Sequence, residues 1–385
     1  MLSFKRALMA AALFITLFFL LTRSHAPEGP SLPIAQEDHP NTDSPPDSSS
    51  KQSSSTPSKP QNEGKVAGKG AAAGGVGGGQ QEPPGQKTMK DMSKMSTYEK
   101  LAYQYPYDVE TKFPAYIWQT WKYTPADGKF IFREEEASWT QHHEGFIHEV
   151  ITDDVAENLI KLFYASVPEV LEAYDAMPLP VLKADFFRYL ILLARGGVYS
   201  DIDTAAIRSA VEWVPDTVPR DTIGLVVGIE ADPDRPDWAE WYSRRIQFCQ
   251  WTIQAKPGHP VLRDVVSRIT AETLRRKRAG SLAGFQDKNV IEFTGPAIWT
   301  DTVFEYFNDP RYFVLGEGEG LIDWKNFTGM ETAKKVGDVI VLPITSFSPG
   351  VQQMGAKDVD DPMAFVKHGF QGTWKPENER HIGET

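Results

Sequence analysis

The pattern of apolar and polar positions divides the 385-residue chain into an apolar run, a long polar stretch and a patterned remainder. The apolar run, residues 7–22, follows Lys5 and Arg6 and is about as long as the shortest helices that cross a bilayer. Positive charge before such a run keeps the N-terminus cytosolic and sends the following residues across the membrane. We therefore predict a cytosolic tail (1–6), a signal-anchor transmembrane helix (7–22), a disordered stem (23–96) and a folded domain (97–385).

The stem is predicted from composition, because residues 23–96 are rich first in Ser and Pro and then in Gly and Ala. Such a stretch buries too little apolar surface to offset the entropy lost on ordering. A cleaved signal peptide is the alternative interpretation of the apolar run, with cleavage after Ser24-His25-Ala26. Pro27 would directly follow that cut, which disfavours cleavage.

Within the remainder, short apolar runs of strand length alternate with runs of helical period. Strands are expected at residues 113–122, 145–151, 198–203 and 222–229. Helices are expected at 153–166 (Asp153 as its N-cap, with Val155, Leu159, Leu162 and Phe163 on its apolar face), 181–195, 238–255 and 260–278. This alternation is typical of an α/β sheet with helices on both faces, where ligands bind beyond the carboxyl ends of the strands.

The strongest chemical signal is Asp201-Ile202-Asp203, at the end of a predicted strand. Because side chains alternate along a strand, two carboxylates separated by one residue point the same way. Their oxygens suit Mn²⁺ or Mg²⁺, which neutralise a diphosphate leaving group. Asp185 and Arg188, three residues apart upstream, share a helix face. They could form a mere surface ion pair, but apolar neighbours disfavour that, and the combination indicates a nucleotide-sugar site.

Composition also limits which ligands and modifications the chain is expected to have. The net charge is −12 with a pI of about 5.2, which argues against nucleic acid and leaves an anionic ligand dependent on a cation. Cys249 is the single cysteine, so no intrachain disulfide can form. Asn326 begins the sequon Asn326-Phe327-Thr328 and is a candidate N-glycosylation site if the domain is lumenal.

From about Tyr98 onward the chain resembles the fungal Golgi α-1,6-mannosyltransferases of glycosyltransferase family 32, which initiate outer-chain growth on N-glycans. The resemblance is densest in residues 113–122, 183–204, 228–232, 241–260, 346–355 and 361–375. It implies a GT-A fold, GDP-mannose as donor, a high-mannose N-glycan as acceptor, a divalent cation (Mn²⁺ or Mg²⁺) and retention at the anomeric carbon. It also implies a single-pass type II protein of the Golgi membrane with a lumenal catalytic domain.

The resemblance also implies roles for individual residues. Asp203 would ligate the metal directly, Asp201 would contact the metal through water or the ribose, and His368 would be a late metal ligand. Asp185 and Arg188 would hold the mannose hydroxyls and the diphosphate. Further donor contacts are expected from Trp118, Gln119, Thr120, Gly197, Tyr199 and Trp374. The acceptor-side candidates are Glu230, Asp232, Gly295 and Pro296.

Several alternatives remain open at this point. Trp118 would otherwise be a core tryptophan and His368 a surface histidine, and no carboxylate is identified as a nucleophile. The chain could elongate rather than initiate, or act within a Golgi mannan-polymerising complex. An aspartyl-phosphate phosphatase also uses a D-x-D pair, but there the first Asp follows an entirely apolar strand early in the domain.

Overall fold

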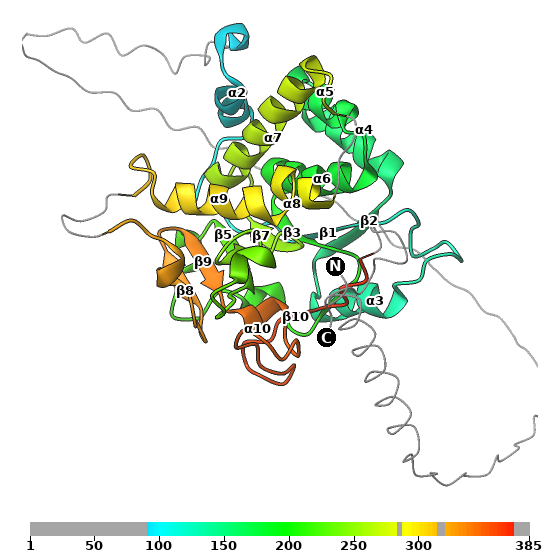
Figure 1. The fold of residues 1–385 in the computed structure, drawn as a ribbon. Coiled ribbons are helices and arrows are strands. Elements are labelled where there is room, and N and C mark those ends of the chain that lie inside the picture. Colours follow the sequence, from blue (N-terminus) through cyan, green and yellow to red (C-terminus); the bar gives the residue numbers. More distant parts are fainter. Residues whose placement is uncertain (1–90, 283–286, 314–319, 373–385) are drawn as a thin grey trace, which may run out of the picture. The chain divides into compact units, whose positions relative to one another are not determined.

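The computed structural model describes residues 91–282, 287–313 and 320–372, which build an α/β unit around a mixed eight-stranded sheet (Figure 1). The strand order is β2-β1-β3-β7-β5-β9-β8, with β6 paired to β5. The strands are β1 (Tyr116–Thr120), β2 (Ile147–Ile151), β3 (Gly197–Ser200), β5 (Leu225–Ala231), β6 (Gln247–Phe248), β7 (Thr252–Ala255), β8 (Lys334–Val336) and β9 (Val339–Leu342). A separate two-stranded sheet pairs β4 (Thr204–Ala206) with β10 (Val366–His368).

The strand directions define two edges of the main sheet. β1 pairs parallel with β2 and β3, and β5 pairs parallel with β9. β3 and β5 each pair antiparallel with β7, so β3 and β5 run in the same direction. The carboxyl ends of β1, β3, β5 and β9 therefore lie at one edge, which we call the carboxyl edge, and their beginnings lie at the amino edge.

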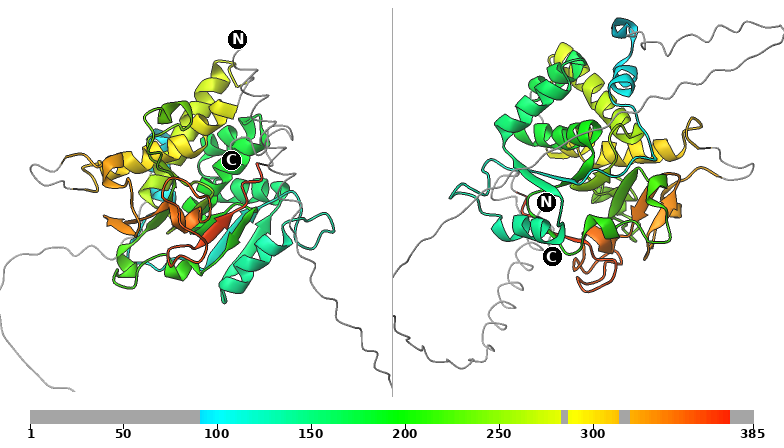
Figure 2. Two further views of the ribbon diagram at one scale, coloured as in Figure 1. Left: turned by 60° about the horizontal axis from the view of Figure 1, so that its bottom comes forward. Right: turned by 180° about the vertical axis from the view of Figure 1, so that it is seen from behind.

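Helices cover both faces of the sheet, as the alternating pattern predicts. The helices are α2 (Thr97–Gln104), α3 (Arg133–His142), α4 (Asp153–Phe163), α5 (Pro168–Ala176), α6 (Pro180–Arg195), α7 (Pro260–Arg278), α8 (Asp287–Phe293), α9 (Pro296–Phe307) and α10 (Ile344–Phe347). The large hydrophobic core joins one face to the helices α4–α9, and the views of Figure 2 keep these helices on one side of the sheet. On the other face, a smaller core around Trp139, Trp213 and Phe347 joins the sheet to α3, α10 and β10.

The connection from α6 to β3 places the predicted catalytic residues. Pro180 occupies the first turn of α6, and Gly196 ends the helix at φ +64°, which only glycine adopts without strain. Gly197 follows at φ +97°, and a Cβ there would lie 2.6 Å from the carbonyl oxygen of Tyr116. Glycine at this position therefore allows β3 to approach β1, and the strand is buried along its whole length.

Some sequence-based element predictions were wrong. The predicted helix 238–255 is instead a 3₁₀ turn (Trp238–Glu240) followed by β6 and β7. The helix predicted at 153–166 ends at Phe163, Thr152 rather than Asp153 is its N-cap, and its buried residues are Ala156 and Ile160. Val155 and Leu162 of the predicted apolar face are 46% and 70% exposed.

The bounds of all four predicted strands also differ from the prediction, and the strands expected at 113–122 and 145–151 are the shorter β1 and β2. The strand expected to reach Asp203 stops at Ser200, and the strand expected at 222–229 runs from Leu225 to Ala231. The helices predicted at 181–195 and 260–278 are confirmed as α6 and α7.

The predicted membrane anchor, 7–22, and most of the predicted stem lie outside the described residues. Among the residues that are described, no helix combines the length and apolar character needed to cross a bilayer. The 3₁₀ helix η1 (Met92–Lys94) lies inside the stretch predicted as stem, and the capping box of Ser96 and Glu99 starts α2.

Candidate active site

Asp201 and Asp203 lie in a tight turn between β3 and β4, and not on a strand as predicted. The turn is closed by the N–H and hydroxyl of Thr204, which donate to the carbonyl oxygen of Asp201 at 3.2 and 2.6 Å. β10 pairs antiparallel with β4 and sets His368 opposite Thr204. The two carboxylates and the imidazole are thus brought together by a turn and a strand pair, rather than by alternation along one strand.

The three side chains have the geometry of a divalent-cation site, which we call the DxD cluster (Asp201, Asp203 and His368). Their candidate ligand atoms all lie within 4.8 Å of one another. Nε2 of His368 is 3.3 Å from Oδ1 of Asp203, close to the roughly 3 Å that separates neighbouring ligands of an octahedral ion. Two carboxylate oxygens and one imidazole nitrogen are a donor set that Mn²⁺ and Mg²⁺ accept. The residues therefore fit the predicted metal.

The surroundings of His368 and Asp203 fix both side chains. The imidazole lies between Trp251 and Phe370, with ring centroids 4.2 and 4.1 Å away. The N–H of Gln371 donates to Oδ2 of Asp203 at 3.0 Å. Burial raises the pKa of Asp203, but the contacts with His368 and Gln371 outweigh it and hold the pKa below its ordinary value. Asp203 therefore remains an anionic ligand.

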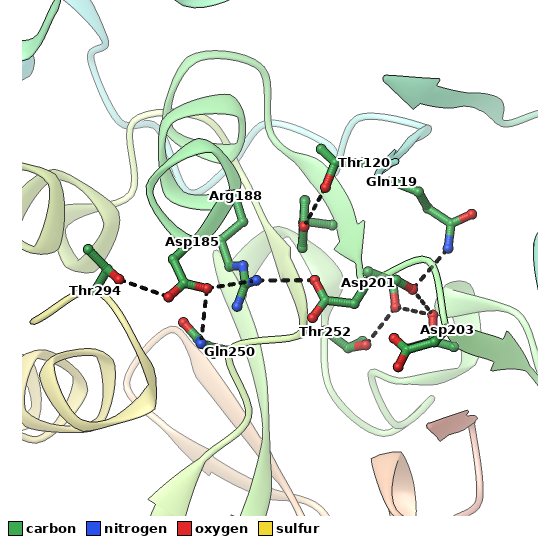
Figure 3. A network of polar contacts seen from close by, with 12 residues as sticks. Gln119, Thr120, Asp185, Arg188, Asp201, Asp203, Gln250, Thr252 and Thr294 are labelled. Carbon is green, nitrogen blue, oxygen red and sulfur yellow. Dashed lines mark hydrogen bonds and ion pairs between the residues drawn. The ribbon is translucent and has the colours of Figure 1, made fainter. Parts of the chain in front are cut away.

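A buried polar network joins the DxD cluster to α6 (Figure 3). Nη2 of Arg188 lies 3.0 Å from Oδ1 of Asp185 and 3.2 Å from Oδ1 of Asp201. Asp185 also accepts hydrogen bonds from Gln250 (3.3 Å) and Thr294 (2.8 Å). The predicted helix-face pair is thus a fully buried part of the site, and the surface ion-pair alternative is wrong.

Arg188 has N–H groups that this network does not use as hydrogen-bond donors. Nε and Nη1 of Arg188 are buried and have no hydrogen-bond partner among the described residues. The guanidinium stacks over the ring of Tyr199, 5.2 Å from its centroid. Burial raises the pKa of Asp185 to about 6, even though Arg188 and Thr294 oppose the shift. Because an unpaired buried guanidinium N–H is costly, these two groups point to an anionic or hydroxyl-bearing ligand.

The two acidic acceptor-side candidates, Glu230 and Asp232, have different surroundings. Glu230 is near the DxD cluster, since His368, Arg188 and Asp201 all act on its charge, and burial raises its pKa to about 7. Its Oε2 is shielded from solvent and lacks a partner within the described part of the chain. Asp232 instead accepts from Thr328, from the N–H of Gly329 and from Arg245. Asp232 therefore holds the segment at Thr328 and Gly329 in place, and Glu230 is the carboxyl that belongs to the site.

The residues predicted as donor contacts on β1 have specific neighbours. Trp118 is a core side chain, 7% exposed, whose indole N–H donates to the carbonyl oxygen of Gly196. Gln119 donates to the carbonyl oxygen of Asp201 at 3.1 Å, and Thr120 is hydrogen-bonded to the hydroxyl of Tyr199. Gln119 thus supports the DxD turn, and Thr120 contacts Tyr199, over which Arg188 stacks. Trp118 packs in the core. Their contact with a donor stays a prediction.

The remaining candidates are Gly295, Pro296, Asn326 and Trp374. Gly295 and Pro296 begin α9, and a Cβ on Gly295 would lie 2.7 Å from Cα of Ile291, so helix packing requires that glycine. Asn326 is exposed in a 3₁₀ turn, where its Oδ1 accepts the N–H of Asp323. Trp374 lies outside the described residues.

Sequence reasoning missed two members of the network, Gln250 and Thr294. Gln250 comes from the loop before β7 and Thr294 from the junction of α8 and α9, both far from α6 in sequence. Thr294 directly precedes the predicted Gly295-Pro296 pair, which was the available signal. Nothing local marks Gln250.

Comparison with known proteins agrees with this geometry. The family described as "Glycosyltransferase sugar-binding region containing DXD motif" matches residues 132–220, which include the DxD turn and most of its support. The matched profile and the buried acidic cluster define the class, a DXD-containing glycosyltransferase. Among solved structures, the PaToxG glycosyltransferase aligns with 54% of this chain and 74% of its own at 14% identity and a TM-score of 0.34, too loose a match to support an argument.

Curated relatives give the family. An initiation-specific α-1,6-mannosyltransferase of Candida albicans is 51% identical over 292 residues, covering 72% of this chain and 76% of the relative. Proteins of the same description from Schizosaccharomyces pombe and Saccharomyces cerevisiae are 46% and 34% identical. They are covered over 67% and 83% of their lengths, with 72% and 74% of this chain aligned. The chain belongs to this family of α-1,6-mannosyltransferases.

Proposed function

We propose that the chain transfers mannose from GDP-mannose, with retention and with a divalent cation, onto the core of N-glycans in α-1,6 linkage. This step would initiate outer-chain mannan. The proposal is supported by the relatives' descriptions and by the site's chemistry. The observation that carries it is the juxtaposition of the DxD cluster with a buried Arg188 whose Nε and Nη1 have no partner among the described residues.

The side chains divide the work of binding the donor. Asp201, Asp203 and His368 would hold the cation, which when bound supplies charge neutralisation for the departing diphosphate. Arg188 would direct its unpaired N–H groups at anionic or hydroxyl oxygens of the donor, in charge-assisted hydrogen bonds. Asp185, fixed by Gln250 and Thr294, orients that guanidinium. Because the orienting groups come from three separate elements, the site is preorganised before the donor binds.

We also propose the placement that the sequence predicts: a type II protein of the Golgi membrane, anchored by residues 7–22, with a lumenal catalytic domain. Support comes from the apolar run after Lys5 and Arg6 and from the exposed sequon at Asn326. Retention of the full-length protein in membranes after alkaline carbonate washing, with glycan on Asn326, is the expected result. Recovery of a soluble chain that begins near Pro27 would contradict it.

One assay tests the reaction and its acceptor together. The full-length protein is given GDP-mannose, Mn²⁺ and either a high-mannose N-glycan or a short α-1,6-linked mannose oligosaccharide. We expect transfer to the N-glycan and little to the oligosaccharide. The reverse preference would indicate an elongating enzyme, and no transfer to either would overturn the proposal.

A further inference from the structure

The loop that follows β5, residues 232–246, carries three large aromatic side chains at the surface. Trp241 is 65% exposed, and Trp238 and Tyr242 are partly exposed. An exposed indole of this size is uncommon on a soluble surface, and such side chains are enriched where proteins recognise partners.

The loop leaves the sheet at the same edge as the DxD cluster. β5 runs in the direction of β3, so the loop begins at the carboxyl edge, where Asp201 follows β3. The charge of Glu230, the residue before the last of β5, reaches Tyr242: burial is the main cause that raises the pKa of Tyr242, and Glu230 adds to it. Glu230 in turn is within reach of the charges of His368 and Asp201. Tyr242 and the DxD cluster thus both lie within electrostatic range of Glu230.

The loop is held in place by arginines. Arg244 makes paired hydrogen bonds to Asp301 of α9 (2.6 Å each) and to Glu292 of α8 (3.0 Å each). Arg245 bonds to Asp232 at 2.7 Å. These anchors fix the base of the loop and leave its aromatic tip exposed.

The exposed indole of Trp241 makes a cation–π contact. The guanidinium of Arg235 lies 5.0 Å from the ring centroid of Trp241 and is itself held by paired bonds to Asp237 at 2.5 and 2.7 Å. The guanidinium of Arg235 therefore packs on Trp241, whose side chain stays 65% exposed beside hydrogen-bonding groups.

We propose that this loop is an acceptor subsite in which a sugar ring of the glycan stacks on Trp241 while the chain's reacting end extends past Glu230. The inference rests on the proposed function, since it names where that reaction's second substrate binds. A pyranose has one apolar face and a rim of hydroxyls, which matches an indole bordered by Arg235, Asp237 and Glu240. The carboxylates around the tip disfavour an anionic membrane surface as the occupant.

Kinetics of Trp241→Ala in the full-length protein test the subsite. We expect the KM for a high-mannose N-glycan acceptor to rise about tenfold, equivalent to about 1.4 kcal/mol of lost binding, while the KM for GDP-mannose changes by less than about twofold. Trp241→Tyr should recover most of the affinity because it keeps an aromatic face. Tyr103→Ala is the matched control, since Tyr103 is an exposed aromatic residue on α2. An unchanged acceptor KM in Trp241→Ala would overturn the proposal.

A binding measurement separates this proposal from the proposed reaction. A free high-mannose oligosaccharide is added without donor, and saturation-transfer NMR reports contact of its ring protons with the protein. The signal should be present for the wild-type protein and Tyr103→Ala and be lost for Trp241→Ala. Equal signals in all three, or none in the wild type, would reject the subsite even if transfer from GDP-mannose occurs. Loss of signal in Trp241→Ala alone would uphold the subsite even if GDP-mannose were the wrong donor.

Discussion

At the carboxyl edge of the sheet, Asp203 lies beside His368, and at the amino edge Asp338 lies beside His259. Asp338 directly precedes β9, which is parallel to β5, so the two pairs occupy opposite ends of the strands. We call Asp338, Tyr107, Tyr306 and His259 the Asp338 cluster. Both clusters combine a carboxylate with an imidazole 3.3 Å away.

The two clusters differ in how many of their polar atoms have hydrogen-bond partners within the protein. In the Asp338 cluster, the hydroxyls of Tyr107 and Tyr306 donate to the two carboxylate oxygens, and Nε2 of His259 is the cluster's one buried atom without a hydrogen-bond partner among the described residues. Around the DxD cluster, by contrast, Nδ1 of His368, Oε2 of Glu230 and two nitrogens of Arg188 lack partners among the residues that the structure describes. Since buried polar groups are normally paired, the saturated carboxylate is structural and the unsaturated cluster is built for a ligand.

The largest effect should come from Asp203→Asn. This change removes the ligand charge but leaves an oxygen to accept the N–H of Gln371, so the turn should survive. Losing several kcal/mol of charge stabilisation would reduce transfer on the order of 10³-fold, and excess EDTA should do the same to the wild-type protein. Activity is measured with GDP-mannose over a Mn²⁺ titration, with the thermal midpoint as the folding control. Full turnover in EDTA would show that transfer does not require a metal ion.

Arg188→Lys should have the next largest effect. A lysine keeps the charge near Asp185 and Asp201 but cannot place two further N–H groups toward a donor. We expect kcat/KM for GDP-mannose to fall about 100-fold, equivalent to about 2.7 kcal/mol. Arg195→Lys, at the exposed end of the same helix, is the matched control and should stay near wild type. Equal kinetics of the two variants would return Arg188 to a structural role.

Asp338→Asn should reverse the pattern, affecting stability and not chemistry. Replacing the carboxylate leaves a tyrosine hydroxyl and His259 with a poorer partner, and the free energy of unfolding should drop by about 1–3 kcal/mol near neutral pH. Activity per folded molecule should be retained. Asp216→Asn is the surface control, because the Asp216 side chain is fully exposed. Loss of activity in stably folded Asp338→Asn protein would contradict the comparison.

The smallest effect is the pH dependence of that stability difference. Burial would raise the pKa of Asp338, but His259 and the two tyrosines outweigh it and hold the pKa well below its ordinary value of 3.8. A carboxyl with a lowered folded-state pKa stabilises the fold above its unfolded pKa, and this stabilisation fades as pH falls below about 4. The gap between the denaturant midpoints of the wild-type protein and Asp338→Asn should therefore begin to narrow below about pH 4 and keep narrowing as the pH falls further. A constant gap would show that the charge of Asp338 is not the cause.

The parts of the fold that sequence could predict are those with a local cause. The Gly196-Gly197 pair fixes the end of α6 and the start of β3 because both glycines need positive φ, and the 3.6-residue pattern of 260–278 is unbroken. The helix predicted at 238–255 failed because clustered Trp, Tyr and Ile residues mimic a helical face. They instead belong to an exposed loop and two short strands whose pairing partners lie elsewhere in the chain.

Site residues could be predicted only as far as local spacing carried information. Asp185 and Arg188 share a helix face, and the structure brings both to Asp201. Glu230 and Asp232 have the same spacing, but Asp232 follows the end of β5 and bonds to Thr328 and Gly329, a tertiary contact that the spacing does not reveal. Gln250 and Thr294 reach Asp185 through tertiary packing alone, which no local pattern encodes.

The pairing of β10 with β4 has a consequence for the order of events during synthesis. The N–H of Gln371 reaches Asp203 across 168 residues of sequence, and His368 comes from the same late segment. At ordinary translation speeds the ribosome delivers these partners roughly ten to thirty seconds after Asp203. Until then the nascent chain carries both aspartates without the imidazole that completes the DxD cluster. A product released before residue 366 would therefore keep the aspartate pair but lack His368 and the N–H of Gln371, which complete the cluster.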